Sequence, residues 1–213
     1  MYIPKIYRNE SVDDTREFIR RNGFATLVST VAGRPWATHI PLLLDRNDSG
    51  KDILHGHISK ANPQWKNFST DQEVLAIFLG PHAYISPSWY DHENVPTWNY
   101  LAVHVYGKIS VIDGEKLLQS LSKLTDVYEH GKEHPVSVDR LSAKTLHDNL
   151  HGVVGFEIEI SDIHSAKKLS QNRHDLDYAN IIKELDKTGN AGDRAIAREM
   201  EKNRKYEDNK SRN

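Results

Sequence analysis

Six β-rich segments constrain the fold of this chain more than any other feature. Short turns at AGRP (32–35) and at Asn47 to Gly50 join the first three segments, which favours antiparallel hairpins. The segments are FATLVSTV (24–31), WATHIPLLLD (36–45), DILHGHI (52–58), EVLAIFLG (73–80), TWNYLAVHVYGKISVI (97–112) and HGVVGFEIEISDI (151–163). Since strands and helices do not alternate regularly, the pattern predicts a mainly β protein with α additions, built as an antiparallel barrel. Gly107, inside the fifth segment, predicts a bulge or a close backbone approach.

Helical patterns lie around these strands and dominate the end of the chain. The expected helices are Val12–Asn22, Gly114–Tyr128, a weaker Arg140–Asn149, and two short ones at Leu176–Leu185 and Arg194–Lys202, separated by Gly189 and Gly192. From Lys167 onward the sequence is polar and highly charged. We therefore expect a barrel domain at residues 1–166 and a helical C-terminal extension at residues 167–213, with a disordered end.

Composition excludes several classes of function. The 213 residues contain no cysteine, which excludes disulfides, iron–sulfur ligation, thiolate zinc sites and a cysteine nucleophile. The net charge of −2 gives no sign of the basic face that a duplex-binding domain uses. Without an apolar signal core or a membrane-length apolar run, we expect a cytoplasmic protein with no membrane association. Common nucleotide, zincin and hydrolase motifs are absent from the sequence.

The stretch from His55 to Asn62 (HGHISKAN) joins a strand to a helix or turn. Such a junction can offer backbone N–H groups to an anion, and Ser59 and Lys60 add a hydroxyl and a positive charge. A phosphate site is one interpretation, and a capped helix with a solvated lysine is the other. His55 and His57 point to one face of the strand and, with His39 or His104, could bind a metal or haem. With 12 histidines in the chain, such pairs arise by chance, and we expect no metal site.

A second group of residues is aromatic, and a third is polar. Large rings could form the wall of a pocket for a flat heterocycle whose polar edge Asn99 reads, or they could pack in a core or subunit interface. The rings are Trp89, Tyr90, Trp98, Tyr100 and Tyr106. The polar run KKLSQNR (167–173) could reach a ligand across a dimer, or it could be a linker to the tail.

Taken together, the sequence resembles the PaiB-type family of FMN-binding negative transcriptional regulators. The matching blocks are MYIPKIY, ATHIPLLLD, LHGHISKANPQW, LAIFLGPHAYISPSWY, VPTWNYLAVHVYGKI, HGVVGFEIEI and KLSQNR, in family order over nearly the whole chain. The resemblance implies an FMN-binding split barrel that forms a homodimer with flavin at the subunit boundary.

By similarity to split-barrel flavoproteins, the resemblance also implies which residues contact FMN. His39, Ile40 and Pro41 would line the isoalloxazine, and His57, Ser59, Lys60 and Asn62 would hold the phosphate. Trp98, Asn99, Gln171 and Arg173 would approach from the partner chain. Related flavin oxidases usually have an arginine in the ring-lining strand, where this chain has Thr38 and His39.

The resemblance implies a regulatory role in transcription. Direct DNA binding has little support, because the sequence has no helix-turn-helix pattern. The alternative is an FMN-dependent oxidoreductase or flavin reductase-like enzyme, in which the protein binds and orients the flavin. Its catalytic residues are unknown, although His39 and His104 are candidate proton donors. A haem- or metal-binding barrel is a third hypothesis.

Overall fold

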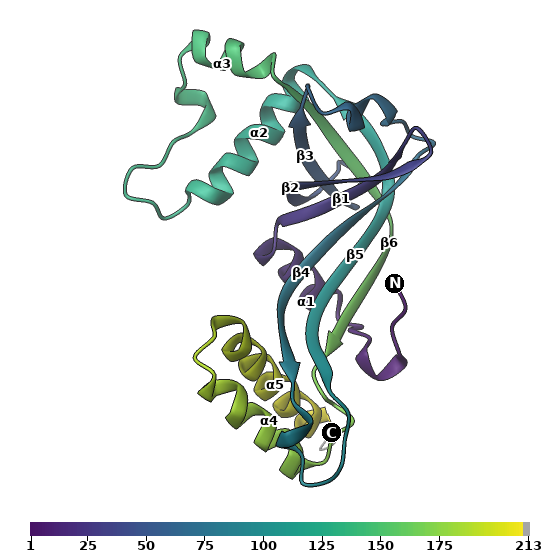
Figure 1. Ribbon diagram of the computed structural model, residues 1–213. Helices are drawn as coiled ribbons and strands as arrows, with labels where there is room; N and C mark the ends of the chain where they lie inside the picture. The colour runs from purple at the N-terminus through teal and green to yellow at the C-terminus, as the bar shows by residue number, and fades with distance from the viewer. Residues whose placement is uncertain (211–213) are drawn as a thin grey trace. The chain divides into compact units, whose positions relative to one another are not determined.

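The computed structural model describes residues 1–210, with side chains described up to Arg204. Six strands form a closed barrel in the order β1-β2-β3-β6-β5-β4 (Figure 1). They are β1 (Phe24–Val31), β2 (Arg34–Arg46), β3 (Asp52–Ser59), β4 (Glu73–Ile85), β5 (Thr97–Ile112) and β6 (Val153–Lys168). The α-helices are α1 (Val12–Arg21), α2 (Gly114–Glu129), α3 (Ala143–Leu150), α4 (Asp175–Lys187) and α5 (Ala191–Lys210). The 3₁₀ helices are η1 (Lys5–Tyr7), η2 (Pro63–Asn67), η3 (Pro87–Trp89) and η4 (Val138–Arg140).

This architecture confirms the expected mainly β class with α additions. The pairings of β1 with β2 and β4, and of β3 with β2 and β6, are antiparallel. In the β1–β2 hairpin the register runs from Phe24↔Pro41 to Val31↔Arg34 and leaves Ala32 and Gly33 as the loop. Both loop residues have positive φ, 50° and 76°, as a two-residue turn between twisted strands requires.

The chain forms two compact units. The barrel unit comprises Arg16–Phe78 and His104–Ile163, and the terminal unit comprises Met1–Thr15, Leu79–Val103 and the chain from His164 onward. The strands β4, β5 and β6 contribute residues to both units. The expected disorder of the chain end concerns residues that lie outside those described.

Alternating apolar residues fill the core of the barrel unit, where Leu27, Phe78 and Phe156 are fully buried. Gly107 allows a close backbone approach there, as expected, because an added Cβ would collide with the carbonyl oxygen of Glu159.

The helices of the barrel unit follow the sequence pattern with one correction. In α2, Leu117 and Leu124 are buried as expected for one stripe. The helix expected at Arg140–Asn149 begins later, at Ala143, because the Ser142 side chain caps it by accepting from the Thr145 N–H group. Val138–Arg140 forms the separate helix η4.

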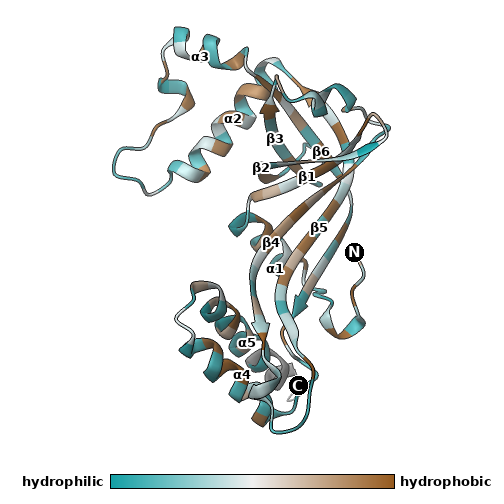
Figure 2. Ribbon diagram, viewed as in Figure 1, coloured by the Kyte–Doolittle hydropathy of each residue, from teal (hydrophilic) through white to brown (hydrophobic). Residues whose placement is uncertain are grey.

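In the terminal unit α4 and α5 pack side by side (Figure 1), and both helices alternate between hydrophobic and hydrophilic residues (Figure 2). Ile181, Leu185, Ile196 and Met200 are buried. Gly189, with a φ of 75°, lies between the helices, whereas Gly192 lies inside α5 and does not separate them.

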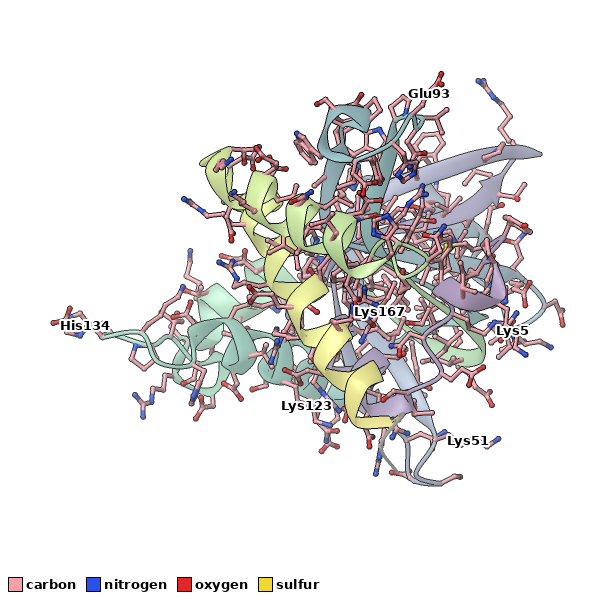
Figure 3. The ribbon with its side chains drawn as sticks, turned by 90° about the horizontal axis from the view of Figure 1, so that it is seen from below. Lys5, Lys51, Glu93, Lys123, His134 and Lys167 are labelled. Atoms are coloured by element: carbon pink, nitrogen blue, oxygen red, sulfur yellow. The ribbon has the colours of Figure 1, made fainter. Side chains whose placement is uncertain are left out.

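Figure 3 labels several ionisable side chains, of which Lys5, Lys51 and Glu93 are exposed. Among the helices in the described part of the chain, none combines the length and apolar character that crossing a membrane requires.

Candidate functional site

The segment expected to line a flat ring lies on β2, where side chains alternate between two faces. Ile40 is buried in the core, so its side chain is turned away from the face that carries His39 and Pro41. His39 is exposed, and its Nδ1 atom lies 2.9 Å from the Thr26 hydroxyl on β1. The Phe24 ring, 69% exposed, stacks beside the His39 imidazole with centroids 6.4 Å apart. Phe24 and His39 thus present two roughly parallel flat groups to solvent.

The segment expected to bind phosphate lies where β3 ends and η2 begins. In the antiparallel β2–β3 ladder, Leu42 pairs with Gly56, so His39–Pro41 and His57–Ser59 flank the same end of the ladder. The Asn62 amide donates to the Thr38 hydroxyl over 2.9 Å. The segment expected to line the ring and the segment expected to bind phosphate are therefore joined inside the barrel unit.

A buried glutamine, Gln64, anchors this junction, and sequence reasoning missed it. Its side chain is 0% exposed and accepts a 2.6 Å hydrogen bond from the Thr38 hydroxyl. Its Nε2 atom donates to the Ser29 hydroxyl over 3.0 Å. The only available signal was its position after Asn62-Pro63, where Asn62 caps η2 by accepting from the Gln64 N–H group over 3.0 Å.

The expectation that backbone N–H groups are free at this junction is wrong. The Lys60 N–H group donates to the Gly152 carbonyl over 2.8 Å, and the Asn62 N–H group donates to the Ser59 carbonyl over 2.9 Å. The Ala61 N–H group donates to the Ser59 hydroxyl oxygen over 3.3 Å. An anion at this junction would therefore have to bind mainly through side chains.

Two side chains remain suitable for that role. Lys60 is exposed, and its ammonium forms no ion pair with any residue the structure describes. The Ser59 hydroxyl keeps its proton available, because its oxygen is only an acceptor for Ala61. His57 is half-buried, and burial lowers its pKa, which favours the neutral imidazole. A neutral imidazole binds an anion more weakly than a protonated imidazolium does.

The other expected contacts lie in the terminal unit. Trp98 is 53% exposed, with its ring centroid 5.8 Å from that of Tyr84 in an edge-on arrangement and 6.2 Å from that of His82. Asn99 is 0% exposed and accepts a 3.1 Å hydrogen bond from the Ser170 hydroxyl. The Asn99 side chain therefore has a structural role in this conformation, whereas Trp98 is available for contact.

The KLSQNR segment forms a tight turn after β6. Ser170 has a φ of 60°, which is unusual for a residue other than glycine, and its bond to Asn99 holds it there. Gln171 folds back, accepting from the Leu169 N–H group over 2.8 Å and donating to the Lys167 carbonyl over 2.5 Å. Its amide is thus used within the turn.

Arg173 follows this turn, and its guanidinium lies 4.9 Å from the centroid of the Tyr90 ring. Burial raises the pKa of Tyr90, and the charge of Arg173 partly offsets that rise. Lys168 lies nearby and donates to the Thr97 hydroxyl over 2.5 Å. Burial, together with the Arg173 charge, lowers the pKa of Lys168. Arg173 and Lys168, both in the KKLSQNR run, therefore form a basic pair, although the resemblance had assigned a flavin contact only to Arg173.

The histidines considered for a metal do not form a group of three possible ligands in the described part of the chain. His55 is buried between two carboxylates, with its Nε2 atom 3.7 Å from Asp45 and 3.8 Å from Glu157. Burial lowers the pKa of His55, and Glu157 and Asp45 partly oppose that shift. His55 is thus part of a buried polar network of the barrel unit.

Comparison with known proteins places the chain in a family. It belongs to the family described as "Putative FMN-binding domain", whose model matches residues 1–162. The curated "Protease synthase and sporulation protein PAI 2" of Bacillus subtilis (strain 168) is 45% identical over 201 residues, covering 94% of this chain and 97% of the relative. These matches confirm the resemblance inferred from the sequence.

Solved structures with the same fold are more distant in sequence. The FAD and heme binding protein from Mycobacterium smegmatis has a TM-score of 0.60 at 17% identity, covering 81% of this chain and 79% of that one. The flavocytochrome Anf3 from Azotobacter vinelandii has a TM-score of 0.60 at 16% identity, covering 84% and 78%. At such identities the likeness shows the fold alone, and it confirms the split barrel.

Proposed function

We propose that this protein is an FMN-binding regulatory protein that works as a homodimer. FMN binding is supported mainly by the Asn62–Thr38 hydrogen bond. It joins β2, which carries the exposed His39 ring, to the β3–η2 junction, which carries the Lys60 ammonium. The donor set fits FMN in two respects. Phe24 and His39 offer flat groups to a heterocycle, and Lys60 and Ser59 offer a charge and a hydroxyl to a phosphate.

The visible spectrum of the purified protein, followed by an FMN titration monitored by flavin fluorescence, tests this proposal. Lys60→Ala should weaken FMN binding by about 1.5–3 kcal/mol, because it removes a charge-assisted hydrogen bond. That corresponds to roughly a 10- to 150-fold rise in Kd. Lys66→Ala is the matched control, since Lys66 is an exposed lysine of η2 and its loss changes the net charge equally. Equal affinities of the two variants would remove Lys60 from the site.

The homodimer is supported by the exposed aromatic surface of the terminal unit. Tyr84 and Trp98 are both exposed and in ring contact, and aromatic residues are enriched where subunits meet. Trp98→Ala should shift the protein toward the monomer in light scattering after size-exclusion chromatography. Tyr2→Ala, which removes an exposed aromatic ring elsewhere, should leave the mass unchanged. A monomeric wild-type protein would refute the dimer.

The regulatory role is supported by the name of the Bacillus subtilis relative, which refers to protease synthesis and sporulation. An anisotropy titration with genomic DNA, repeated across salt concentrations, tests direct DNA contact. Direct contact through phosphates would give an affinity that falls steeply with salt. An absent or salt-insensitive signal would leave regulation to a partner protein or to an enzymatic activity.

A second candidate, an FMN-dependent oxidoreductase, is favoured by the position of His39. Its Nδ1 atom lies near the Thr26 hydroxyl and the ring is exposed, so it could move a proton to or from a bound group. His39→Gln should then lower the rate of flavin reduction by a nicotinamide donor, measured at saturating FMN so that a change in FMN affinity does not enter the rate. Unchanged reduction would exclude His39 as the proton donor. A haem-type spectrum of the purified protein would favour the haem-binding alternative instead.

A further inference from the structure

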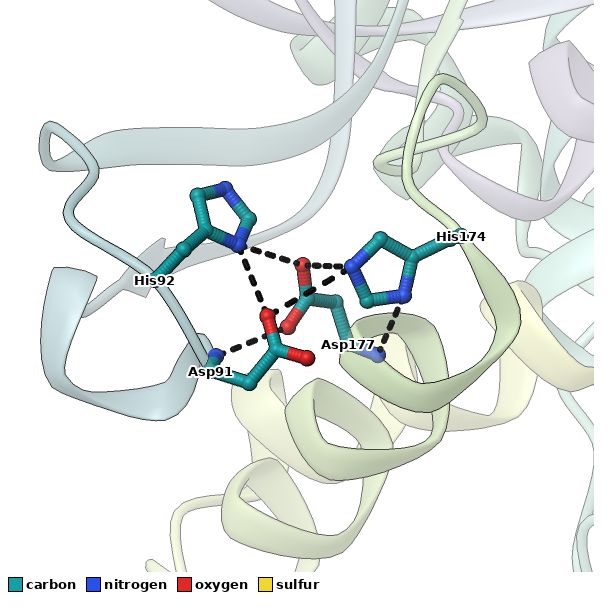
Figure 4. A group of neighbouring side chains, drawn as sticks. All are labelled: Asp91, His92, His174 and Asp177. Atoms are coloured by element: carbon teal, nitrogen blue, oxygen red, sulfur yellow. Dashed lines mark hydrogen bonds and ion pairs between the residues drawn. The ribbon is translucent and has the colours of Figure 1, made fainter.

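Two histidines and two aspartates converge in the terminal unit, outside the proposed flavin site. Asp91 and His92 lie in the loop after η3, and His174 and Asp177 lie at the beginning of α4 (Figure 4). Each residue offers one possible ligand atom, and these four atoms all lie within 4.8 Å of one another. We propose that this cluster is a structural binding site for a divalent transition-metal ion, with Zn²⁺ as the best fit.

The distances between neighbouring ligand atoms, 2.8–3.5 Å, lie close to those of a tetrahedral site. Nδ1 of His92 lies 2.8 Å from Oδ1 of Asp91 and 3.5 Å from Oδ2 of Asp177. Nε2 of His174 lies 3.5 Å from the same Asp91 oxygen and 3.0 Å from the same Asp177 oxygen. Four N and O ligands at their usual distances from Zn²⁺ are about 3.3–3.6 Å apart. Small side-chain adjustments would therefore bring all four atoms onto one ion.

Burial of Asp177 independently points to a cation. Its side chain is 0% exposed, and its Oδ1 atom accepts a 3.1 Å hydrogen bond from the Asp91 N–H group. Its Oδ2 atom is buried and has no hydrogen-bond donor of acceptable geometry among the described residues, although imidazole nitrogens of His174 and His92 lie 3.0 and 3.5 Å away. A buried carboxylate without a donor or a cation is costly, so this oxygen, which faces the centre of the cluster, indicates a missing ligand.

Charge and residue type select the ion. Two carboxylates carry two negative charges, which one divalent cation balances while both imidazoles remain neutral. Among the described residues, no lysine or arginine is ion-paired with Asp91 or Asp177. Imidazole together with carboxylate suits Zn²⁺, and four protein ligands are typical of a structural site.

Zinc binding would change the local hydrogen bonds of one ligand. At present the Asp177 N–H group donates to Nδ1 of His174 over 3.5 Å, a long capping contact. A cation on Nε2 keeps the imidazole proton on Nδ1, so this contact would be lost. In exchange, the ion would tie the loop that leads into β5 to the first turn of α4, and so restrain the segments that carry Trp98 and Arg173.

Zinc titration of chelator-treated, untagged protein tests the site, with a competing chromophoric chelator to measure affinity. The exposed pair His147 in α3 and His151 just after its end, with Nε2 atoms 3.1 Å apart, could also bind zinc, so all measurements use a His151→Ala background. We expect one equivalent of zinc per chain and a rise in Tm with zinc. Co²⁺ in place of Zn²⁺ should give the visible absorption bands of a tetrahedral ion.

Two variants locate the site. His174→Ser removes the imidazole but keeps a good N-cap for α4, and Asp177→Asn removes the buried charge. Each should weaken zinc binding at least tenfold and abolish the zinc-dependent rise in Tm. Circular dichroism of His174→Ser in chelator should match the background protein, which separates lost ligation from lost folding. Failure of the background protein to bind zinc, or unchanged affinity in folded His174→Ser, would overturn the proposal.

Discussion

Replacement of Gln64 by alanine should destabilise the protein by about 3 kcal/mol. The substitution removes the 2.6 Å bond from Thr38 and the 3.0 Å bond to Ser29, each with a net contribution of about 1 kcal/mol. It also removes a buried methylene group, which contributes about 0.8 kcal/mol. For a chain of this size, the total corresponds to a fall in Tm of roughly 6–12 °C.

Urea unfolding followed by tryptophan fluorescence measures this loss, with the m-value checking that the unfolding transition is otherwise unchanged. The matched control is Gln119→Ala on α2, because the Gln119 side chain is exposed and, among the described residues, bonds only to Glu115. The control should change the free energy of unfolding by less than about 0.5 kcal/mol. A loss below about 1 kcal/mol for Gln64→Ala would refute the anchoring role of Gln64. Thr38→Val in a double-mutant cycle with Gln64→Ala should show coupling, since the two side chains share a hydrogen bond.

Three further changes have expected outcomes that unfolding measurements can check. Ala32→Asn should stabilise the protein by about 0.5–1 kcal/mol in urea unfolding, because Asn accepts positive φ in a two-residue hairpin loop more readily than Ala; a loss of stability would contradict this. Gly107→Ala should lower Tm strongly, because the added Cβ would collide with the Glu159 backbone. An unchanged Tm would contradict the requirement for glycine at this close approach. Burial lowers the pKa of His57, so the folded state binds fewer protons than the unfolded state, and stability falls as pH drops below about 6.5. His57→Gln should reduce that fall between about pH 7.5 and 5.5, whereas the exposed His134→Gln control (Figure 3) should follow the wild type; parallel curves for His57→Gln and wild type would refute the assignment.

Much of the fold could be predicted from the sequence because period-two hydrophobic patterns and turn residues are local signals. The strand expected at residues 97–112 agrees with β5, and AGRP forms the expected hairpin turn. Strand ends were harder to place. The expected strand at residues 73–80 was too short, because β4 continues through Pro81 to Ile85. Along β4 the buried positions shift phase between Phe78 and Ala83, so the proline is accommodated where the strict alternation breaks.

The candidate site was less predictable because its chemistry depends on which polar groups already have partners. The residues His57 to Asn62 located the junction. The sequence did not indicate that the backbone N–H groups of Lys60 and Asn62 donate to the carbonyl oxygens of Gly152 and Ser59. Asn99 illustrates the same limit, since an amide beside exposed aromatic residues is buried against Ser170. Hydrogen-bond partners distant in sequence decide each case, and a local pattern contains no information about them.

The two proposed sites differ in how strongly the protein's own energetics require a ligand. Lys60 is exposed, so water satisfies its ammonium, and an absent phosphate costs the fold little. Asp177 is fully buried, and its Oδ2 atom has no well-aligned hydrogen-bond donor among the described residues, so it reduces stability until a cation or such a donor reaches it. Removing FMN should therefore change Tm only through the binding equilibrium. Removing a metal from the cluster of Asp91, His92, His174 and Asp177 should in addition lower the local stability of the terminal unit. Hydrogen exchange at the first turn of α4, with and without chelator, measures that loss directly, and equal protection in both conditions would show that the fold already satisfies Asp177 without an ion.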